Sequence, residues 1–416
     1  MDRSNLADPQ GTPKPPLVSL ISLSDFEHAA QATFTPKAWA FVSSAATDLH
    51  TKTRNAWMYS QITLRPRVLR DVSSVDTSCA MFGRRARLPI FCSPTSLART
   101  VHPGAEGELG KGLKGAGIPM CVSSSASMPL ADIVSEFRAA KTKVPGNDST
   151  GSEKERDLPI FLQLYVDRVR ANSEKLLRTA RALGINALFL TVDSPLPGKR
   201  EADERIQTDE TLTSAISGAT ARNDAKGGAL GRVMGGYIDP RLSWSDIPWL
   251  RKCLPDVPIV LKGIQTWMDA RKALEAGVDG IVVSNHGGRN LDTAPATVLV
   301  LLEMRRNCPE VFDGLEVYVD GGITRGTDIF KALCLGAKAV GVGRGFLYAL
   351  NYGEEGVRRL VDILQDELET TMKLCGVTSL GELHPGLLNT LAVDYLIPGP
   401  DDHLPPRDRS PPKGKL

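Results

Sequence analysis

Eight short apolar runs, spread between residues 88 and 344, constrain the fold of this 416-residue chain more than any other feature. Each run is rich in Val, Ile, Leu or Phe and is bounded by Gly, Pro or polar residues. Continuous apolar runs of this kind are typical of strands buried on both faces, as in a parallel sheet. The eight runs cover residues 88–93, 118–123, 158–166, 187–193, 257–263, 280–285, 316–322 and 339–344.

Amphipathic stretches separate most of these runs, among them 130–141, 172–183, 266–276 and 327–336. Repeated strand–helix units predict βαβ crossovers and therefore an α/β fold. Eight such units are the count of a (β/α)8 TIM barrel, whose active-site residues lie at the C-terminal mouth of the strands. A doubly wound sheet is the alternative, but no G-x-G-x-x-G segment follows the first run.

The flanking and interrupting segments differ in composition from the barrel region. We expect a polar N-terminal tail at 1–20, a barrel domain at 21–395 and a Pro-rich C-terminal tail at 396–416. Within the domain, residues 142–157 are polar and rich in turn formers, which predicts a surface loop. Residues 203–237 follow the fourth run with little strand pattern and are a candidate lid loop.

Charge and cysteine spacing exclude several classes of function. The 50 Lys and Arg residues nearly balance 48 Asp and Glu residues, so no basic excess predicts binding of nucleic acid. No run approaches the length of a membrane span, and the N-terminus has no apolar signal segment. The seven cysteines lack C-x-x-C spacing, which argues against a metal site or disulfides and favours a reducing compartment. We expect an intracellular protein, in the cytoplasm or, because Gly414-Lys415-Leu416 is close to the Ser-Lys-Leu signal, in the peroxisome.

The segment SNHGGRNLD, residues 284–292, directly follows the sixth run and is the strongest candidate for chemistry. The imidazole of His286 can take a proton near neutral pH. The guanidinium of Arg289 can hold a carboxylate through two parallel hydrogen bonds. A polar loop with a capping His and a solvated Arg is the alternative, but the place after a barrel strand favours catalysis.

Two glycine-rich segments, 320–322 and 341–345, follow the seventh and eighth runs. Loops at these places in a barrel often bind phosphate through backbone N–H groups, and Arg344 would add a positive charge. Lys262 ends the fifth run, where its charge requires an anionic partner, such as an anionic cofactor.

Polar residues also end the third and fourth runs. Asp193 can orient and stabilise a protonated His, although a helix N-cap is an alternative role. Gln163 and Tyr165 alternate onto the same side of the third run, where a buried Tyr often has only a structural role.

Several of these segments together resemble the FMN-dependent 2-hydroxy acid oxidase/dehydrogenase family, which includes glycolate oxidase and lactate oxidase. The resemblance extends over residues 36–390 and is carried by 65–78, 88–108, 190–203 (LTVDSPLPGKREAD), 261–264 (LKGI), 284–292 and 320–344. It implies a TIM barrel with FMN at its mouth and the oxidation of an L-2-hydroxy acid to a 2-oxo acid. It also implies a homo-oligomer of four or more subunits, and O2 or an external acceptor for the electrons.

The same resemblance implies a role for each matched residue. His286 corresponds to the catalytic base, Asp193 to its carboxylate partner and Lys262 to the lysine beside the flavin ring. Arg200, Arg289 and Tyr165 correspond to the residues that bind the substrate. The flavin-ring contacts correspond to Thr95, Ser96, Ser123, Gln163, Thr191, Ser284 and Lys262, and the ribityl and phosphate contacts to Asp320, Gly322, Arg325, Gly343 and Arg344.

Three positions depart from the family pattern. Val42 stands where the family usually has a second substrate-binding tyrosine, and Ser125 stands where glycolate oxidase has a tryptophan. Both changes remove a ring, so we expect a wider substrate pocket and a substrate larger than glycolate. Thr324 replaces the first of the two arginines that usually follow the DGG segment, so we expect a weaker phosphate contact there, with Arg325 and Arg344 remaining.

Two other functions stay open on the sequence. The same flavin scaffold could oxidise a carbonyl-adjacent alcohol or amine of a specialised biosynthetic pathway, a hypothesis that Val42 and Ser125 motivate. A non-catalytic flavin-binding protein is the third hypothesis, and the retention of His286, Arg289 and Lys262 argues against it.

Overall fold

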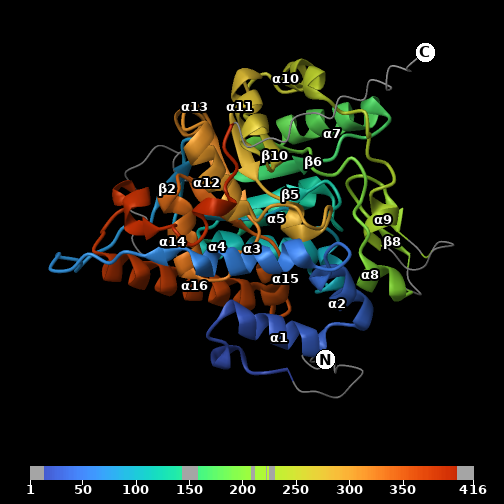
Figure 1. Ribbon diagram of the computed structural model, residues 1–416. Coiled ribbons are helices and arrows are strands. Elements are labelled where there is room, and N and C mark those ends of the chain that lie inside the picture. The colour runs from blue at the N-terminus through green and yellow to red at the C-terminus, as the bar shows by residue number, and fades with distance from the viewer. Residues whose placement is uncertain (1–13, 143–157, 208–210, 222, 224–229, 401–416) are drawn as a thin grey trace, which may run out of the picture.

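The computed structural model describes residues 14–142, 158–207, 211–221, 223 and 230–400. Eight parallel strands close into a barrel in the order β10-β11-β12-β13-β4-β5-β6-β7 (Figure 1). Their bounds are β4 (Ile90–Cys92), β5 (Met120–Ser123), β6 (Ile160–Leu164), β7 (Ala187–Thr191), β10 (Ile259–Ile264), β11 (Gly280–Val283), β12 (Glu316–Asp320) and β13 (Ala339–Val342). The predicted TIM barrel is confirmed, and each predicted apolar run overlaps one barrel strand.

Aromatic side chains fill the barrel interior. Phe161 stacks on Phe189 with ring centroids 4.9 Å apart, and Phe91 meets Phe189 at 5.8 Å and Tyr318 at 5.6 Å. The hairpin of β2 (Cys79–Met81) and β3 (Arg84–Ala86) carries Phe82 against Phe161 and Tyr318 at the N-terminal ends of their strands. This packing leaves the opposite, C-terminal end of the barrel as the end where a ligand can bind.

Helices follow the barrel strands and surround them (Figure 1). The longest, α16, packs against α4, α14 and α15, and its αL C-cap Gly376 donates its N–H back to Met372 and Lys373. Their bounds are α4 (Ala105–Ala116), α5 (Leu130–Ala139), α7 (Arg170–Ala182), α10 (Ile247–Cys253), α11 (Trp267–Glu275), α12 (Thr297–Asn307), α13 (Val311–Gly314), α14 (Gly326–Cys334), α15 (Arg344–Leu350) and α16 (Gly353–Cys375).

Three N-terminal helices, α1 (Leu23–Thr33), α2 (Pro36–Ser43) and α3 (His50–Gln61), lie against the loops at the C-terminal mouth. Helix α3 contacts the 3-10 turn η4 (His286–Gly288), α1 contacts α15, and α2 contacts α8 (Glu201–Arg205) and α15. Ser22 and Thr35 cap α1 and α2 by accepting hydrogen bonds from the backbone. These helices therefore add side chains from the first 61 residues to the mouth of the barrel.

Smaller elements complete the described chain. Strand β1 (Thr63–Leu64) pairs with β14 (Leu388–Asn389), and the other short turns are η1 (Leu17–Ser19), η2 (Ala98–Thr100), η3 (Trp244–Asp246), η5 (Leu380–Glu382), η6 (Pro385–Leu387) and η7 (Asp394–Leu396). The predicted lid loop holds the end of α8, the hairpin of β8 (Leu212–Thr213) and β9 (Thr220–Ala221), and α9 (Leu230–Met234) in its described part. Three predicted features lie mostly or wholly outside the described residues. They are the 142–157 loop, the two tails and the C-terminal Gly414-Lys415-Leu416. None of the described helices combines the length and apolar character needed to cross a membrane.

Candidate active site

A cavity of about 310 Å³ opens at the C-terminal mouth of the barrel. Its lining comes mainly from segments that follow barrel strands, 93–96 after β4, 286–290 after β11, 320–324 after β12 and 341–345 after β13. Helices α1, α2 and α3 contribute further lining residues from one side. The cavity thus lies where the strand–helix alternation predicts an active site.

His286 lies in this cavity between a carboxylate and a phenol. Its Nδ1 is 3.1 Å from Oδ1 of Asp193, and its Nε2 is 3.2 Å from the hydroxyl oxygen of Tyr165. The carboxylate is fully buried, whereas the imidazole remains 22% exposed and lines the cavity. Because Nδ1 donates to the carboxylate, Nε2 is the atom that can accept a proton from a ligand.

The loop around His286 is held in an unusual backbone conformation. His286 and Gly287 have φ angles of 58° and 62°, and the side chain of Asn285 accepts a hydrogen bond from the N–H of Gly288 at 3.2 Å. The amide of Asn285 also pairs reciprocally with the amide of Asn55, with both N···O distances at 2.8 Å. Left-handed backbone at a histidine persists only where the surroundings enforce it, so these amides fix the position of the imidazole.

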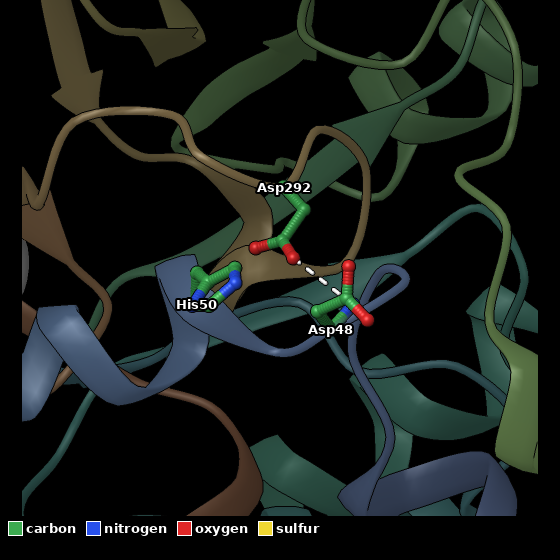
Figure 2. A group of neighbouring side chains, drawn as sticks. All are labelled: Asp48, His50 and Asp292. Atoms are coloured by element: carbon green, nitrogen blue, oxygen red, sulfur yellow. Dashed lines mark hydrogen bonds between the residues drawn. The ribbon is translucent and has the colours of Figure 1, made fainter.

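Asp292, the last residue of the SNHGGRNLD segment, fastens the same loop to α3. Figure 2 shows its carboxylate facing Asp48 and His50 at the start of that helix. One oxygen accepts from the N–H of Thr51 at 2.8 Å, and the other accepts from the N–H of Asp48 and the hydroxyl of Thr47, both at 3.0 Å. The side chains of Asp48, His50 and Asp292 lie close enough to share an ion. The hydrogen bonds show that Asp292 caps the first turn of α3 from the loop after β11, since Leu49 at the N-cap position supplies no side-chain acceptor.

Burial and charge set the pKa values of the central pair. Burial lowers the pKa of His286 below its usual value, and the attraction of Asp193 opposes this shift without cancelling it. Burial would raise the pKa of Asp193, but the charges of His286 and Lys262 outweigh it and lower that pKa. The pair therefore consists of a neutral imidazole and a carboxylate at neutral pH, which is the state a general base requires.

Lys262 has its anionic partner within the protein. Its Nζ donates to the hydroxyl of Ser284 at 2.9 Å and lies 3.3 Å from Oδ2 of Asp320, which also accepts from Ser93 at 3.1 Å. Burial would lower the pKa of Lys262, but the charges of Asp320 and Asp193 outweigh it and raise that pKa. Lys262 is therefore a buried, charged group at the floor of the cavity.

The predicted flavin-ring residues form a chain of hydrogen bonds along the barrel mouth. Ser96 lies 3.3 Å from Ser123, which donates to Oε1 of Gln163 at 3.1 Å, and Gln163 donates to Thr191 at 2.9 Å. Thr95 and Ser96 line the cavity directly. The chain fixes the amide orientation of Gln163 and offers polar atoms to a planar ligand placed above it.

Two guanidinium groups, of the buried Arg200 and the half-buried Arg289, also line the cavity. Arg289 donates to the carbonyl oxygens of Phe41 and Val42, both at 3.0 Å, while Nε of Arg200 has no hydrogen-bond partner among the described residues. Burial lowers the pKa of each arginine, and the nearby charge of Arg200 lowers that of Arg289 further. Gly231 makes room for Arg200, since a Cβ there would lie 1.8 Å from its guanidinium. Cations that converge in this way favour an anionic ligand.

The predicted phosphate residues do not all reach the cavity. Gly322, Gly343 and Arg344 line it, and so does Thr324. The guanidinium of Arg325 instead pairs with Glu367 at 2.8 Å, and Arg325 is not among the lining residues. The structure therefore does not bring this predicted contact together with the others.

The sequence analysis assigned no role to some of the lining residues. They include Phe41, Lys52, Pro197, Ile238 and Asn290. Asn290 donates to the carbonyl of Asp193 at 2.9 Å and to the hydroxyl of Ser194, and so connects the loops after β11 and β7. Its place in the quoted SNHGGRNLD segment was the available clue.

The cavity fits an elongated ligand with a planar polar ring and an anionic end. The lining includes Lys262 and the hydroxyl groups of Thr95 and Ser96, which suit a polar ring, and Arg344 with the glycines after β12 and β13, which suit an anionic group. A Cβ at Gly322 would lie 2.4 Å from the backbone oxygen of Asn55, so only glycine fits there. Oδ1 of Asp320 is buried without a hydrogen-bond partner among the described residues, which leaves an acceptor for a ligand hydroxyl. These features match a flavin mononucleotide.

Fold and site together define an α/β-barrel flavoenzyme. Residues 30–390 match the model of the FMN-dependent dehydrogenase family, and the chain belongs to that family, whose cofactor is FMN. The predicted family and cofactor are therefore confirmed.

Curated relatives and solved structures agree with this assignment. The chain is 39% identical over 395 residues to the L-lactate dehydrogenase (cytochrome) of Wickerhamomyces anomalus, covering 94% of this chain and 65% of the relative. It is 40% identical over 367 residues to a peroxisomal (S)-2-hydroxy-acid oxidase of Oryza sativa subsp. japonica, covering 87% of this chain and 94% of the relative. The chain thus spans slightly less than two thirds of the first relative but nearly all of the second.

Two solved structures resemble this chain over most of its length. The flavin-binding domain of baker's yeast flavocytochrome b2 has 38% identity and a TM-score of 0.78, over 92% of this chain and 90% of that chain. Mandelate oxidase with (S)-4-hydroxymandelic acid has 33% identity and a TM-score of 0.78, over 89% of this chain and 98% of that chain.

Proposed function

We propose that this chain oxidises an L-2-hydroxy acid to the corresponding 2-oxo acid, with His286 as the base, and that it prefers side chains larger than that of glycolate. The observation that carries the proposal is one cavity lined by the imidazole of His286, whose buried carboxylate partner lies behind it, and by the guanidinium groups of Arg200 and Arg289. A 2-hydroxy acid needs both functions, a cation for its carboxylate and a base for its hydroxyl.

The arginines bind and orient the substrate. Arg289 and Arg200 lie over the same ring, that of Phe41, at 5.3 and 6.0 Å from its centroid. Two guanidinium groups on one side of a cavity can hold a carboxylate through paired charge-assisted hydrogen bonds. Holding the carboxylate there places the neighbouring C–OH group toward His286 and Tyr165.

His286 then takes the hydroxyl proton on Nε2. Asp193, at 3.1 Å from Nδ1, stabilises the imidazolium that forms, and Tyr165 can donate a hydrogen bond to the substrate oxygen. FMN, when bound, would accept the hydrogen of the substrate carbon together with its bonding electron pair, so that the C–O bond becomes the carbonyl of the 2-oxo acid. Lys262 contributes a positive charge to the cavity lining, and Ser284 holds that side chain in place by accepting a hydrogen bond from its Nζ.

The size preference follows from the lining of the cavity beside the arginines. Val42 and Ser125 line the cavity with side chains that carry no aromatic ring. Pro197 and Ile238 add apolar surface. Mandelate oxidase, a relative at 33% identity, carries an aromatic hydroxy acid in its structure, which supports a bulky side chain. The name of the rice relative supports the (S) configuration, which is L for these acids.

The test compares kcat/KM for L-2-hydroxy acids of increasing side-chain size in the wild type and in Val42→Tyr. We expect the wild type to prefer longer or aromatic acids, and Val42→Tyr to shift the ratio toward small acids by at least the roughly 10- to 200-fold that one methylene group is worth in an apolar pocket. Val68→Tyr is the matched control, because Val68 is 80% exposed and does not line the cavity. A wild type that prefers glycolate would contradict the proposed size preference.

A second candidate function has one observation in its favour. Both carbonyl contacts of Arg289 come from the protein itself, so this guanidinium is already partly satisfied. A neutral alcohol or amine beside a carbonyl group needs fewer hydrogen bonds and less positive charge from Arg289 than a carboxylate does. Flavin reduction by an ester or amide, but not by the matching acid, would favour this candidate.

The electron acceptor, the oligomeric state and the cellular compartment belong to the same proposal. The relatives include an oxidase and a cytochrome-linked dehydrogenase, so either O2 or an external acceptor fits. The name of the rice oxidase supports a peroxisomal location. A homo-oligomer of four or more subunits stays a prediction, which the mass of the protein in solution would test.

A further inference from the structure

Three cations converge on the C-terminal end of α2. Arg289 donates to the carbonyl oxygens of Phe41 and Val42, and Arg344 donates to those of Val42 at 3.1 Å and Ser44 at 2.9 Å. The third cation, Lys52, donates to the carbonyl oxygen of Ser43 at 2.9 Å. The last carbonyl groups of a helix have no partner within the helix and carry partial negative charge, so they attract cations. Arg289 and Arg344 already have roles, whereas Lys52 has none.

Lys52 occupies a fixed place at the rim of the cavity. It is the third residue of α3, directly after Thr51, whose N–H is held by Asp292. Its backbone packs on the loop after β11, since a Cβ at Gly288 would lie 2.6 Å from the backbone nitrogen of Lys52. The side chain extends into the same cavity as Arg344 and Thr324. The position of the ammonium therefore depends on a rigid helix start.

The charges around Lys52 leave room for an anion. An ammonium group has three N–H donors, and within the described residues its hydrogen bond to Ser43 accounts for one of them. Burial lowers the pKa of Lys52, and the nearby charges of Arg344 and Arg289 lower it further, while Glu27 raises it. Two neighbouring cations and one carboxylate indicate an excess of positive charge at this end of the cavity.

The usual phosphate arginine is absent from this end. Thr324 takes its place in the sequence, and its hydroxyl donates to Asp328 at 3.1 Å. Arg325 is directed toward Glu367, as described above. Among the residues at positions 320–325, none therefore supplies a cation to the cavity. A phosphate monoester carries roughly −1.5 to −2 charges near neutral pH, more than Arg344 alone balances.

We propose that Lys52 binds the phosphate group of FMN together with Arg344, and so replaces the cation that this chain lacks at position 324. On FMN binding, the ammonium keeps or exchanges its contact with Ser43 while its remaining N–H groups face the phosphate oxygens. The proposal concerns the cofactor and is independent of the identity of the substrate.

The test measures the dissociation constants of FMN and of riboflavin, which lacks the phosphate, for the full-length chain by flavin fluorescence. We expect Lys52→Met to weaken FMN binding about 10- to 100-fold, the range of one charge-assisted hydrogen bond, and to leave riboflavin binding unchanged. Lys52→Arg should retain most of the FMN affinity. Lys338→Met is the matched control, because Lys338 is 42% exposed, pairs with Glu316 and does not line the cavity.

A second variant makes the test independent of any loss of structure. Thr324→Arg restores the cation at the family position, so adding it to Lys52→Met should recover the FMN affinity. An equal loss of FMN and riboflavin affinity in Lys52→Met would overturn the proposal and leave Lys52 as a structural cap of α2. Unchanged FMN affinity in Lys52→Met would overturn it as well.

Discussion

Replacing Asp193 by Asn tests whether a buried carboxylate makes His286 a base. The carboxylate is 0% exposed and its Oδ1 lies 3.1 Å from Nδ1 of the imidazole. At an effective dielectric constant of about 20, unit charges roughly 4 Å apart attract by about 4 kcal/mol. A tenfold change in rate corresponds to about 1.4 kcal/mol, so losing this attraction slows proton removal by about 10³-fold. That value lies within the ~10²–10⁴-fold contribution of a positioned general base.

The same substitution alters the pH dependence in a defined direction. The charge of Asp193 raises the pKa of His286 against the larger effect of burial. Removing that charge lowers the pKa of His286 further, so the acid limb of kcat/KM should move to lower pH. An Asn amide can also donate to Nδ1, which would leave the imidazole proton on Nε2 and block the base.

The assay is the rate of flavin reduction on anaerobic rapid mixing with a substrate of the wild type, at equal FMN content. Asp239→Asn is the matched control, because its side chain is also buried, at 1% exposure, but pairs with Arg170 and Arg241. We expect the control to reduce its flavin at the wild-type rate. A rate for Asp193→Asn within threefold of the wild type, with FMN bound, would refute the role of Asp193.

Three further outcomes are expected. Lys262→Met leaves Asp320 as a buried, unpaired carboxylate, so unfolding by urea should show a loss of about 3–5 kcal/mol, and a loss below about 1 kcal/mol would contradict the ion pair. The pKa of His286 is lowered and the base must be neutral, so kcat/KM should fall only as the pH drops below about 6.5. An acid limb of kcat/KM centred above pH 7 would contradict the role of His286 as a neutral base. Asp292→Ala removes the cap of α3 and should cost about 0.5–2 kcal/mol in thermal unfolding, whereas an unchanged melting temperature would show that the cap is dispensable.

The barrel was predictable from the sequence because its strands are buried on both faces. The run at 158–166 contains β6, and the run at 257–263 overlaps β10, with boundaries displaced by only a few residues. The hairpin of β8 and β9 was not predicted, since strands of two residues are too short to produce a period in the sequence. Local pattern thus identifies long buried elements and misses the short ones.

The site was predictable where its residues follow barrel strands. His286 and Asp193 belong to such segments, and the structure places them in contact. Lys52 and Phe41 reach the cavity from helices that precede the barrel, and only tertiary packing brings them there. Arg325 shows the opposite case, because its sequence position suggests the phosphate but Glu367 of α16 draws its guanidinium away.

Ion pairs across the barrel were also invisible in the sequence. Lys262 lies two residues before the end of β10 and Asp320 ends β12, and these two strands are separated in the sheet by β11. Sequence reasoning assigned the balancing charge of Lys262 to a cofactor, whereas the protein supplies it through Asp320. The closure of the barrel, rather than any local motif, brings the two side chains together.

A single anaerobic turnover tests the proposed function most directly. The FMN-loaded protein is mixed with one equivalent of an L-2-hydroxy acid from a series of increasing side-chain size, and flavin absorbance and the 2-oxo acid product are measured together. We expect bulky L acids to bleach the flavin and to yield one equivalent of 2-oxo acid, with their D enantiomers inert. A flavin that stays oxidised with every L acid in the series would contradict the proposed reaction.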